Sequence, residues 1–428
     1  MPPGRRAFAF VWVTVLLDMM GIGLIMPVVP AILHELTGLD AAAASVYGGW
    51  LFFAYAAMQF ACAPLVGALS DAVGRRPVLL LSVLGLGIDH ALTALSPTIA
   101  WLFVGRLVAG GFGASFATAN AYIADVTPAE DRGRAFGMLG AAFGLGFILG
   151  PALGGLLGDA GPRVPFFVAA GLSLTNFLYG VFVLPETHPK DKRTRLRLTQ
   201  ANPLGALTAI PGGAVVRTMA LSLFVFFVGN TVYPSIWSFY TTQRYDWTPR
   251  TIGISLAVYG IVNTIVQAAL VGPAITRWGE RRAAVIGIVT GALALLGTGF
   301  ATTSWMVFAL ILVSAPGGLV MPAMNAIMSK SAPPEAQGRL QGVVSSLEGL
   351  SSIVGPIIMT QLFQGFGASI PGMPFFAATA LCVVSLIVLG VGGGRVAMRS
   401  ASGSTDAVAD LESAEDGQTE RPGGASRG

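Results

Sequence analysis

The chain has 428 residues, of which 54% are apolar and only 11% are charged, and its formal net charge is +4 at pH 7. So few charges cannot coat the surface of a water-soluble protein of this size, and the mean hydropathy of +0.72 agrees. Composition therefore excludes a water-soluble domain and indicates a multi-pass membrane protein.

Twelve mostly apolar stretches of about 20 residues follow one another along the chain, which predicts twelve membrane-spanning helices. The first stretch is too long, and too closely followed by others, to be a cleaved signal peptide. We expect the spans at residues 8–33, 47–66, 78–95, 101–124, 135–157, 164–184, 218–240, 251–271, 283–301, 305–328, 339–363 and 374–393.

An internal repeat divides these spans into two sets of six. Residues 67–76, between the second and third spans, recur 205 positions later as residues 272–281. The same offset relates Gly150-Pro151 to Gly355-Pro356, and a constant offset indicates a duplicated unit, which is typical of secondary transporters. We therefore predict an all-α membrane protein of two pseudo-symmetric six-helix bundles, with an N-terminal bundle at 1–184, a cytoplasmic linker at 185–217, a C-terminal bundle at 218–394 and a disordered cytoplasmic tail at 395–428.

The basic residues predict how the chain lies in the membrane. Nineteen of them fall at the N-terminus, in the loops that follow even-numbered spans and just after the last span, against three on the other side: Arg163, Arg244 and Arg250. By the positive-inside rule both termini are cytoplasmic. The basic excess is thus explained by topology, and no nucleic-acid partner is expected.

Ionisable residues inside the spans are the first candidates for function. Asp18, Asp89 and Glu348 lie in the first, third and eleventh spans, and Arg106 is the one cation well inside a span. A charge at mid-membrane costs about 2.5–3.5 kcal/mol on insertion scales, so it needs a partner or a cavity. We predict that the four residues couple proton binding to conformation, with Asp18 or Asp89 as the partner of Arg106. The alternatives are interhelical hydrogen bonds and a permanent structural ion pair.

The loop between the second and third spans combines glycines, an acid and paired arginines. Asp71 is placed to cap a helix N-terminus, and Arg75 to reach Asp125 at the end of the fourth span. Such a cluster would hold one conformation and break in the other, although a simple stop-transfer signal would also explain the arginines. The predicted inner gate consists of Gly67, Asp71, Gly74, Arg75, Arg76 and Asp125.

Small residues at four-residue spacing mark the fifth span. They let helices approach closely, and a proline among them bends the axis, so this span is a candidate pivot between the halves, or simply a packing surface. The residues concerned are Gly146, Gly150, Pro151, Gly154 and Gly155.

Polar residues within the spans form a candidate substrate site near mid-membrane. They are Tyr55, Gln59, Asn120, Asn230, Asn263, Gln267 and Asn325. The chain contains no nucleotide-binding loop, metal-ligand spacing or nucleophile arrangement above chance, so we expect no metal, no cofactor, no use of ATP and no enzyme.

These motifs resemble those of the major facilitator superfamily. Residues 67–76 are similar to its loop 2–3 signature, Arg106 with Gly110 and Gly113 to its fourth-helix motif, and residues 146–155 to the fifth-helix motif of its antiporters. The resemblance covers nearly the whole chain. It implies a transporter of the twelve-helix drug:proton antiporter group.

A narrower resemblance is to the tetracycline-efflux (Tet) proteins, which are similar over residues 17–30, 74–82, 137–146, 253–260, 278–280 and 338–346. It implies that acids at Asp18 and Asp89 serve transport, that Arg75 pairs with Asp125, and that Asn263 and Gln267 match positions linked to substrate. Tet proteins also carry an essential acid in the ninth span, where this chain has none near Gly291. That departure weakens tetracycline itself as the expected substrate.

We therefore expect proton-coupled efflux of an amphipathic drug, tetracycline-like or multidrug, by alternating access across a bacterial inner membrane. The expected partners are the small-molecule drug, protons and the lipid bilayer, and the expected state is a monomer. Two other functions stay open: proton-coupled uptake of a nutrient or siderophore-like solute on the same fold, and ligand sensing without transport.

Overall fold

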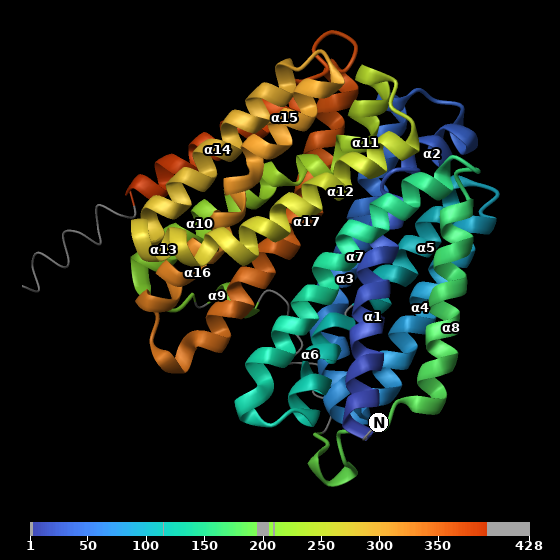
Figure 1. Ribbon diagram of the computed structural model, residues 1–428, viewed down its shortest axis with the longest axis vertical. Coiled ribbons are helices and arrows are strands. Elements are labelled where there is room, and N and C mark those ends of the chain that lie inside the picture. Colours follow the sequence, from blue (N-terminus) through green and yellow to red (C-terminus); the bar gives the residue numbers. More distant parts are fainter. Residues whose placement is uncertain (1–2, 114, 195–204, 209, 392–428) are drawn as a thin grey trace, which may run out of the picture.

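The computed structural model describes residues 3–113, 115–194, 205–208 and 210–391, and every regular element within these ranges is a helix (Figure 1). Eleven helices in these ranges are long and apolar enough to cross a membrane. The remaining predicted span, the fourth, is α5 (Ile99–Phe112), with α6 (Ser115–Val126) following residue 114. The predicted tail at 395–428 lies outside the described residues, as do residues 195–204 and 209 of the predicted linker.

The helices of the first half are α1 (Pro3–Ile25), α2 (Val29–Thr37), α3 (Ala41–Val73), α4 (Arg75–Leu95), α5, α6, α7 (Arg132–Gly158) and α8 (Val164–Val183). Between the halves lies α9 (Gly205–Thr208). Those of the second half are α10 (Gly213–Asn230), α11 (Val232–Tyr245), α12 (Pro249–Ile265), a π-helical stretch η4 (Val266–Leu270), α13 (Val271–Trp278), α14 (Glu280–Phe300), α15 (Ser304–Ser314), a 3₁₀ stretch η5 (Ala315–Leu319), α16 (Val320–Ser331), α17 (Gln337–Phe366) and a last helix, Met373–Val391.

The prediction of one continuous first span, 8–33, is wrong. Residues 26–28 interrupt it, because Pro27 and Pro30 lack an amide hydrogen and disfavour the α conformation in the residue before them. Applying the offset of 205 to Met26 leads to Thr231, where α10 gives way to α11. The two halves therefore break their first helix at the same level.

The two halves meet at one end of the molecule and separate at the other (Figure 1). We use the name basic face for the end of the molecule with the helix ends and connections at 67–76, 127–134, 184–194, 279–282 and 330–338. The opposite face is the end with the connections at 38–40, 96–98, 159–163, 246–248 and 367–372. A continuous buried apolar cluster joins the second half to α2 and α3 near the opposite face, with Ile32, Leu33 and Phe239 among its members. A separate cluster around Phe10, Leu79 and Tyr122 fills the first half near the basic face.

Glycines show where the halves touch. A methyl group added at Gly155 of α7 would lie 2.6 Å from the Pro249 carbonyl oxygen of α12, so the two backbones are in direct contact near the opposite face. At Gly144 the nearest atom across the gap, Thr264 Oγ1, is 3.7 Å away, and at Gly140 no atom of the described residues comes within 4 Å. The helices therefore diverge toward the basic face, and the molecule is open on that side.

The predicted close packing of the fifth span is confirmed in its geometry. Methyl groups added at Gly146 and Gly150 would lie 2.6 Å from the Leu16 carbonyl oxygen and 2.5 Å from that of Met20, and one at Gly154 would collide with Leu24. This glycine stripe faces α1 within the first half, while Gly155 faces α12 across the interface. Only glycine permits backbones to pack this closely.

Candidate functional site

A cavity of about 960 Å³ lies between the halves at the level where the helices break. This volume suits a drug-sized molecule of several rings. Its polar and ionisable lining residues include, from the first half, Asp18, Tyr55, Gln59, Asp89, His90 and Arg106 and, from the second half, Asn230, Tyr233, Ser238, Tyr259 and Glu348.

A buried ion pair forms the wall on the side of α4 and α5. The Arg106 guanidinium donates a hydrogen bond to Asp89 Oδ2; the side chains are 18% and 1% exposed. Asp89 Oδ1 has no hydrogen-bond partner among the described residues, and His90 Nδ1 lies 3.7 Å from Oδ2. Of the two partners that the sequence allowed for Arg106, the structure selects Asp89.

Local sequence explains why this pair can form. Gly105 packs against the acid so closely that an added methyl group would lie 2.7 Å from Asp89 Oδ1. Separation from water raises the free energy of both charges, and removing one partner would leave the other uncompensated. The free carboxylate oxygen is therefore the open position of an otherwise paired site.

Asp18 and Glu348 line the same cavity from the two halves. Asp18, on α1, is 8% exposed. Glu348, on α17, is exposed to the cavity, and its carboxylate makes no hydrogen bond or ion pair among the described residues. The cavity thus contains the Asp89–Arg106 ion pair and, from the second half, Glu348, which has no ion-pair partner among the described residues.

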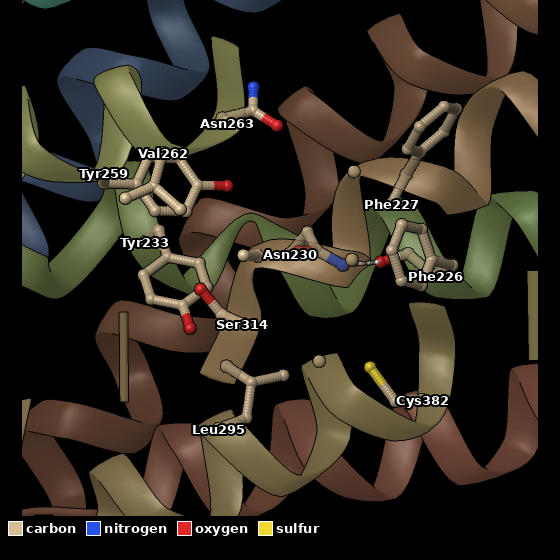
Figure 2. Close-up of a pocket in the computed structure, with 14 residues that line it drawn as sticks. Phe226, Phe227, Asn230, Tyr233, Tyr259, Val262, Asn263, Leu295, Ser314 and Cys382 are labelled. Carbon is tan, nitrogen blue, oxygen red and sulfur yellow. Dashed lines mark hydrogen bonds between the residues drawn. The ribbon is translucent and has the colours of Figure 1, made fainter. Parts of the chain in front are cut away.

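The polar residues predicted for substrate binding divide into two groups. Tyr55, Gln59 and Asn230 line the central cavity, and Asn230 and Asn263 line a smaller pocket beside it (Figure 2). Gln59 Nε2 donates to Tyr55 Oη and to the Gly113 carbonyl, both at 3.1 Å, and so ties α3 to the end of α5.

Asn120, Gln267 and Asn325 line neither cavity, so their predicted place in the substrate site is not supported by the geometry. Each lies on the part of its span nearer the basic face: Asn120 on α6, Gln267 in the exposed π-helical stretch, and Asn325 on α16. Their depth along the spans, closer to the basic face than the two cavities, places them away from the lining residues.

The predicted Arg75 contacts exist at the basic face. Arg75 lies 2.5 Å from Asp71 Oδ1 and 3.3 Å from Asp125 Oδ2, and its Nη1 donates to Ser70 Oγ at 3.0 Å. Arg76 Nη2 donates to the Val181 carbonyl at 2.6 Å. All these partners belong to the first half and are in contact while the basic face is open. The network therefore joins elements of the first half in this conformation, and its breaking in another conformation, the role predicted for an inner gate, stays a prediction.

The helix cap predicted for Asp71 is made by Glu186 instead. Glu186 Oε1 accepts hydrogen bonds from the backbone N–H groups of Arg75, Thr187 and His188 at 2.9–3.0 Å. It thereby satisfies the N-terminus of α4, while Gly74 adopts φ +118°, where its Cα packs against the same carboxylate. The sequence signal was an acid directly after the sixth span, in a segment whose other charges are mostly basic.

The second half contains a charge-reversed copy of this pair. The offset of 205 carries Arg75 to Glu280 and Asp125 to Lys330, and Lys330 Nζ donates to Glu280 Oε1. Gly74 likewise corresponds to Gly279, which also has a positive φ of +77°. The two ion pairs therefore occupy equivalent positions in the halves, with the positive and negative residues exchanged.

The profile described as Major Facilitator Superfamily matches this chain twice, over residues 11–227 and 218–405. Each match covers one half of the fold. The chain belongs to the major facilitator superfamily. The predicted fold class, two pseudo-symmetric six-helix bundles in a multi-pass membrane protein, is thereby confirmed.

Relatives within the superfamily narrow the assignment. The chain is 41% identical over 376 residues to the class C tetracycline resistance protein of Escherichia coli, covering 88% of this chain and 94% of that one. It is 39% identical over 384 residues to the class G protein of Vibrio anguillarum, covering 87% and 94%. The predicted resemblance to the Tet family is confirmed.

Among solved structures, the human organic anion transporter TETRAN is similar with a TM-score of 0.67 and 26% identity, over 91% of this chain and all of that one. The nucleoside transporter NupG has a TM-score of 0.70 at 14% identity, over 92% and 99%, and supports the fold alone. The chain is therefore a transporter of small molecules by family.

Proposed function

We propose that this protein exports an amphipathic drug, of the tetracycline or multidrug kind, in exchange for protons across a bacterial inner membrane. The observation that carries the proposal is the drug-sized cavity between the halves, whose walls contain the buried Asp89–Arg106 pair together with Asp18 and Glu348. Its relatives of classes C and G, named for tetracycline resistance, support the substrate class.

Proton binding acts on the paired acid. A proton added at Asp89 Oδ1, the oxygen without a partner in the described chain, removes the charge that holds Arg106. Arg106 stays protonated and must then seek another acceptor, such as Asp18. The pair therefore has two arrangements, and a conformation that favours one of them binds the proton more tightly than the other.

Exchange follows if drug and proton compete for the same negative charge. A cationic group of the drug is attracted to Glu348, which is exposed in the cavity, and to Asp18 in the cavity wall. The aromatic residues Phe147, Trp237 and Phe239 contact its apolar part. Protonation of the acids lowers that attraction and releases the drug. Deprotonation restores the charge for the next molecule, which gives antiport rather than symport.

Access alternates as the six-helix halves, residues 1–184 and 218–394, rock about the interface of α7 and α12. In the arrangement described here the cavity faces the basic face, which we place in the cytoplasm with both termini, so that this is the drug-loading state of a monomer. The opposite arrangement requires the contacts of Gly155 with α12 and of Ser238 Oγ with the Met26 carbonyl to separate.

The test is transport in everted membrane vesicles energised by an imposed pH gradient, with tetracycline and ethidium as separate probes. We expect uptake of at least one probe into the vesicles, with protons moving the other way, and loss of both movements in Asp18→Asn. Asp246→Asn is the matched control, because it removes the same charge at an exposed position on the opposite face.

Two outcomes would overturn the proposal. One is a wild-type protein that moves neither probe when the gradient is imposed. The other is a wild type and Asp18→Asn that transport equally, which would remove the acids from the mechanism. Drug susceptibility of an efflux-deficient host with and without the gene separates export from uptake, because an importer would raise sensitivity rather than lower it.

A further inference from the structure

A side pocket of about 190 Å³ opens within the second half, between α10, α12, α14, η5 and the last helix (Figure 2). Phe226, Tyr259 and Leu295 give it an apolar wall, and Asn263 and Ser314 are polar residues of its lining. Every lining residue is uncharged. This absence of charge distinguishes it from the central cavity.

The side pocket is reached from the central cavity. Asn230, Tyr233 and Tyr259 line both spaces, and the rings of the two tyrosines stack with centroids 5.8 Å apart at 29°. A molecule in the central cavity can therefore place one of its groups in the side pocket without leaving the cavity. The two spaces are a main site and a subsite.

Glycines create the room. A methyl group added at Gly291 of α14 would meet no atom within 4 Å, so the pocket continues to the helix backbone at that point. At Gly318 of η5 an added methyl would lie 2.9 Å from Asn263 Oδ1, so the missing side chain lets that amide approach the pocket wall. A cavity of about 150 Å³ is sufficient for benzene, so this pocket admits one aromatic ring with small substituents.

Unused hydrogen-bonding groups define what the ring must carry. The Asn263 side-chain amide makes no hydrogen bond among the described residues, and Asn230 uses only its Nδ2, which donates to the Phe226 carbonyl at 3.0 Å. Both amides are half-buried, and a ligand with a donor and an acceptor would use their remaining hydrogen-bonding capacity. A charged group would find no counter-charge here.

We propose that this side pocket binds one uncharged aromatic ring of the transported molecule, a ring that bears hydrogen-bonding substituents such as a phenol or a carboxamide. The charges of the central cavity then bind the ionic part of the same molecule. The assignment deepens the proposed function and relies on it for the statement that the ligand is transported, but binding of the ring can be measured without transport.

The probe is salicylamide, a single ring with a phenol and a carboxamide, at a pH where it is uncharged. Binding is measured by ligand-detected NMR on the purified full chain in lipid nanodiscs. We expect binding to wild type and a loss of about tenfold or more in Gly291→Leu, whose side chain fills the pocket. Asn263→Leu should weaken binding about tenfold through the lost hydrogen bonds.

Gly171→Leu is the matched control. Gly171 is an exposed helical glycine of α8, away from both cavities, and an added methyl there also meets no atom within 4 Å. We expect this variant to bind salicylamide as wild type does. Benzoate tests the requirement for neutrality and cyclohexanecarboxamide the requirement for an aromatic ring, and both should bind at least about tenfold more weakly.

The proposal is overturned if wild type does not bind salicylamide, if benzoate binds equally well, or if Gly291→Leu and Asn263→Leu both bind as wild type does. Size-exclusion chromatography checks that each variant is folded. If one of the two variants does not fold, salicylamide binding by the other variant tests the proposal. If the protein binds salicylamide but transports no drug, the ring-binding site is supported and the proposed efflux function is wrong. If the protein transports tetracycline or ethidium but does not bind salicylamide, the efflux function is supported and the ring-binding site is wrong.

Discussion

The two halves of this molecule share a scaffold and differ in what they bury. The offset of 205 carries Asp18, Asp89 and Arg106 of the first half to Leu223, Ala294 and Ile311 of the second. The charges that face the cavity from the first half are thus replaced by apolar side chains at equivalent points. Conversely, Glu348 of the second half corresponds to Phe143, and both residues line the cavity.

The two halves therefore share the same helix packing but differ in the ionisable and polar groups that they place in the cavity. Buried charges are costly in a membrane, so one half bears most of them and pairs Asp89 with Arg106. The other half offers amides, hydroxyls and aromatic rings, which hold a ligand without demanding a counter-charge. In the proposed exchange, the charged groups of the first half respond to protons, while the second half contributes mainly uncharged contacts to the drug.

The largest expected effect comes from removing one partner of the Asp89–Arg106 ion pair in the first half. Asp89→Asn leaves the Arg106 guanidinium buried without its partner, so we expect loss of proton-driven transport and destabilisation of about 3–5 kcal/mol. The measurements are vesicle transport and thermal unfolding in detergent. The double variant Asp89→Asn/Arg106→Gln should recover most of the stability but no transport, and full transport by either variant would contradict the proton-coupling role.

A smaller effect is expected at Glu348, the acid of the second half that lines the central cavity. Glu348→Gln should weaken apparent affinity for the cation ethidium about tenfold, because a charged contact is lost. Thermal stability should stay close to that of wild type, since Glu348 has no ion-pair partner in the described chain. Unchanged ethidium transport would show that the second half contributes no charge to recognition.

Equivalent glycines at the basic face offer a direct comparison of the halves. Gly74 and Gly279 both have positive φ, +118° and +77°, where a side chain costs of order 1–3 kcal/mol. Only Gly74 packs against another group, the Glu186 carboxylate, whereas a methyl at Gly279 meets no atom within 4 Å. Gly74→Ala should therefore lower the apparent Tm more than Gly279→Ala, and equal shifts would exclude the Glu186 contact as a source of stability.

The smallest effect is expected at the charge-reversed pair. The Lys330 side chain is 70% exposed, so Lys330→Gln should change the free energy of unfolding by less than about 1 kcal/mol and leave transport intact. Arg75→Gln should cost more, because Arg75 contacts Asp71, Asp125 and Ser70 together. Thermal unfolding of the two variants side by side checks the order, and a larger loss in Lys330→Gln would reverse it.

Sequence by itself determined the membrane class, the number and order of the spans, the duplication and the family, but not the break within the first span. Apolar run length and repeat offset are properties of the linear chain, so no folding was needed to find them. It also singled out Asp18, Asp89, Arg106 and Glu348, because a charge within an apolar run is conspicuous whatever surrounds it.

Only the tertiary structure decided which of these groups meet. Whether Arg106 pairs with Asp18 or Asp89, whether Asp71 or Glu186 caps α4, and which asparagines reach a cavity all depend on the rotation and tilt of neighbouring helices. Asn263 and Asn325 are alike in sequence as polar residues within apolar spans, yet only Asn263 lines a pocket. The side pocket itself exists because Gly291 and η5 are brought together from different spans, a contact that no local pattern along the chain encodes.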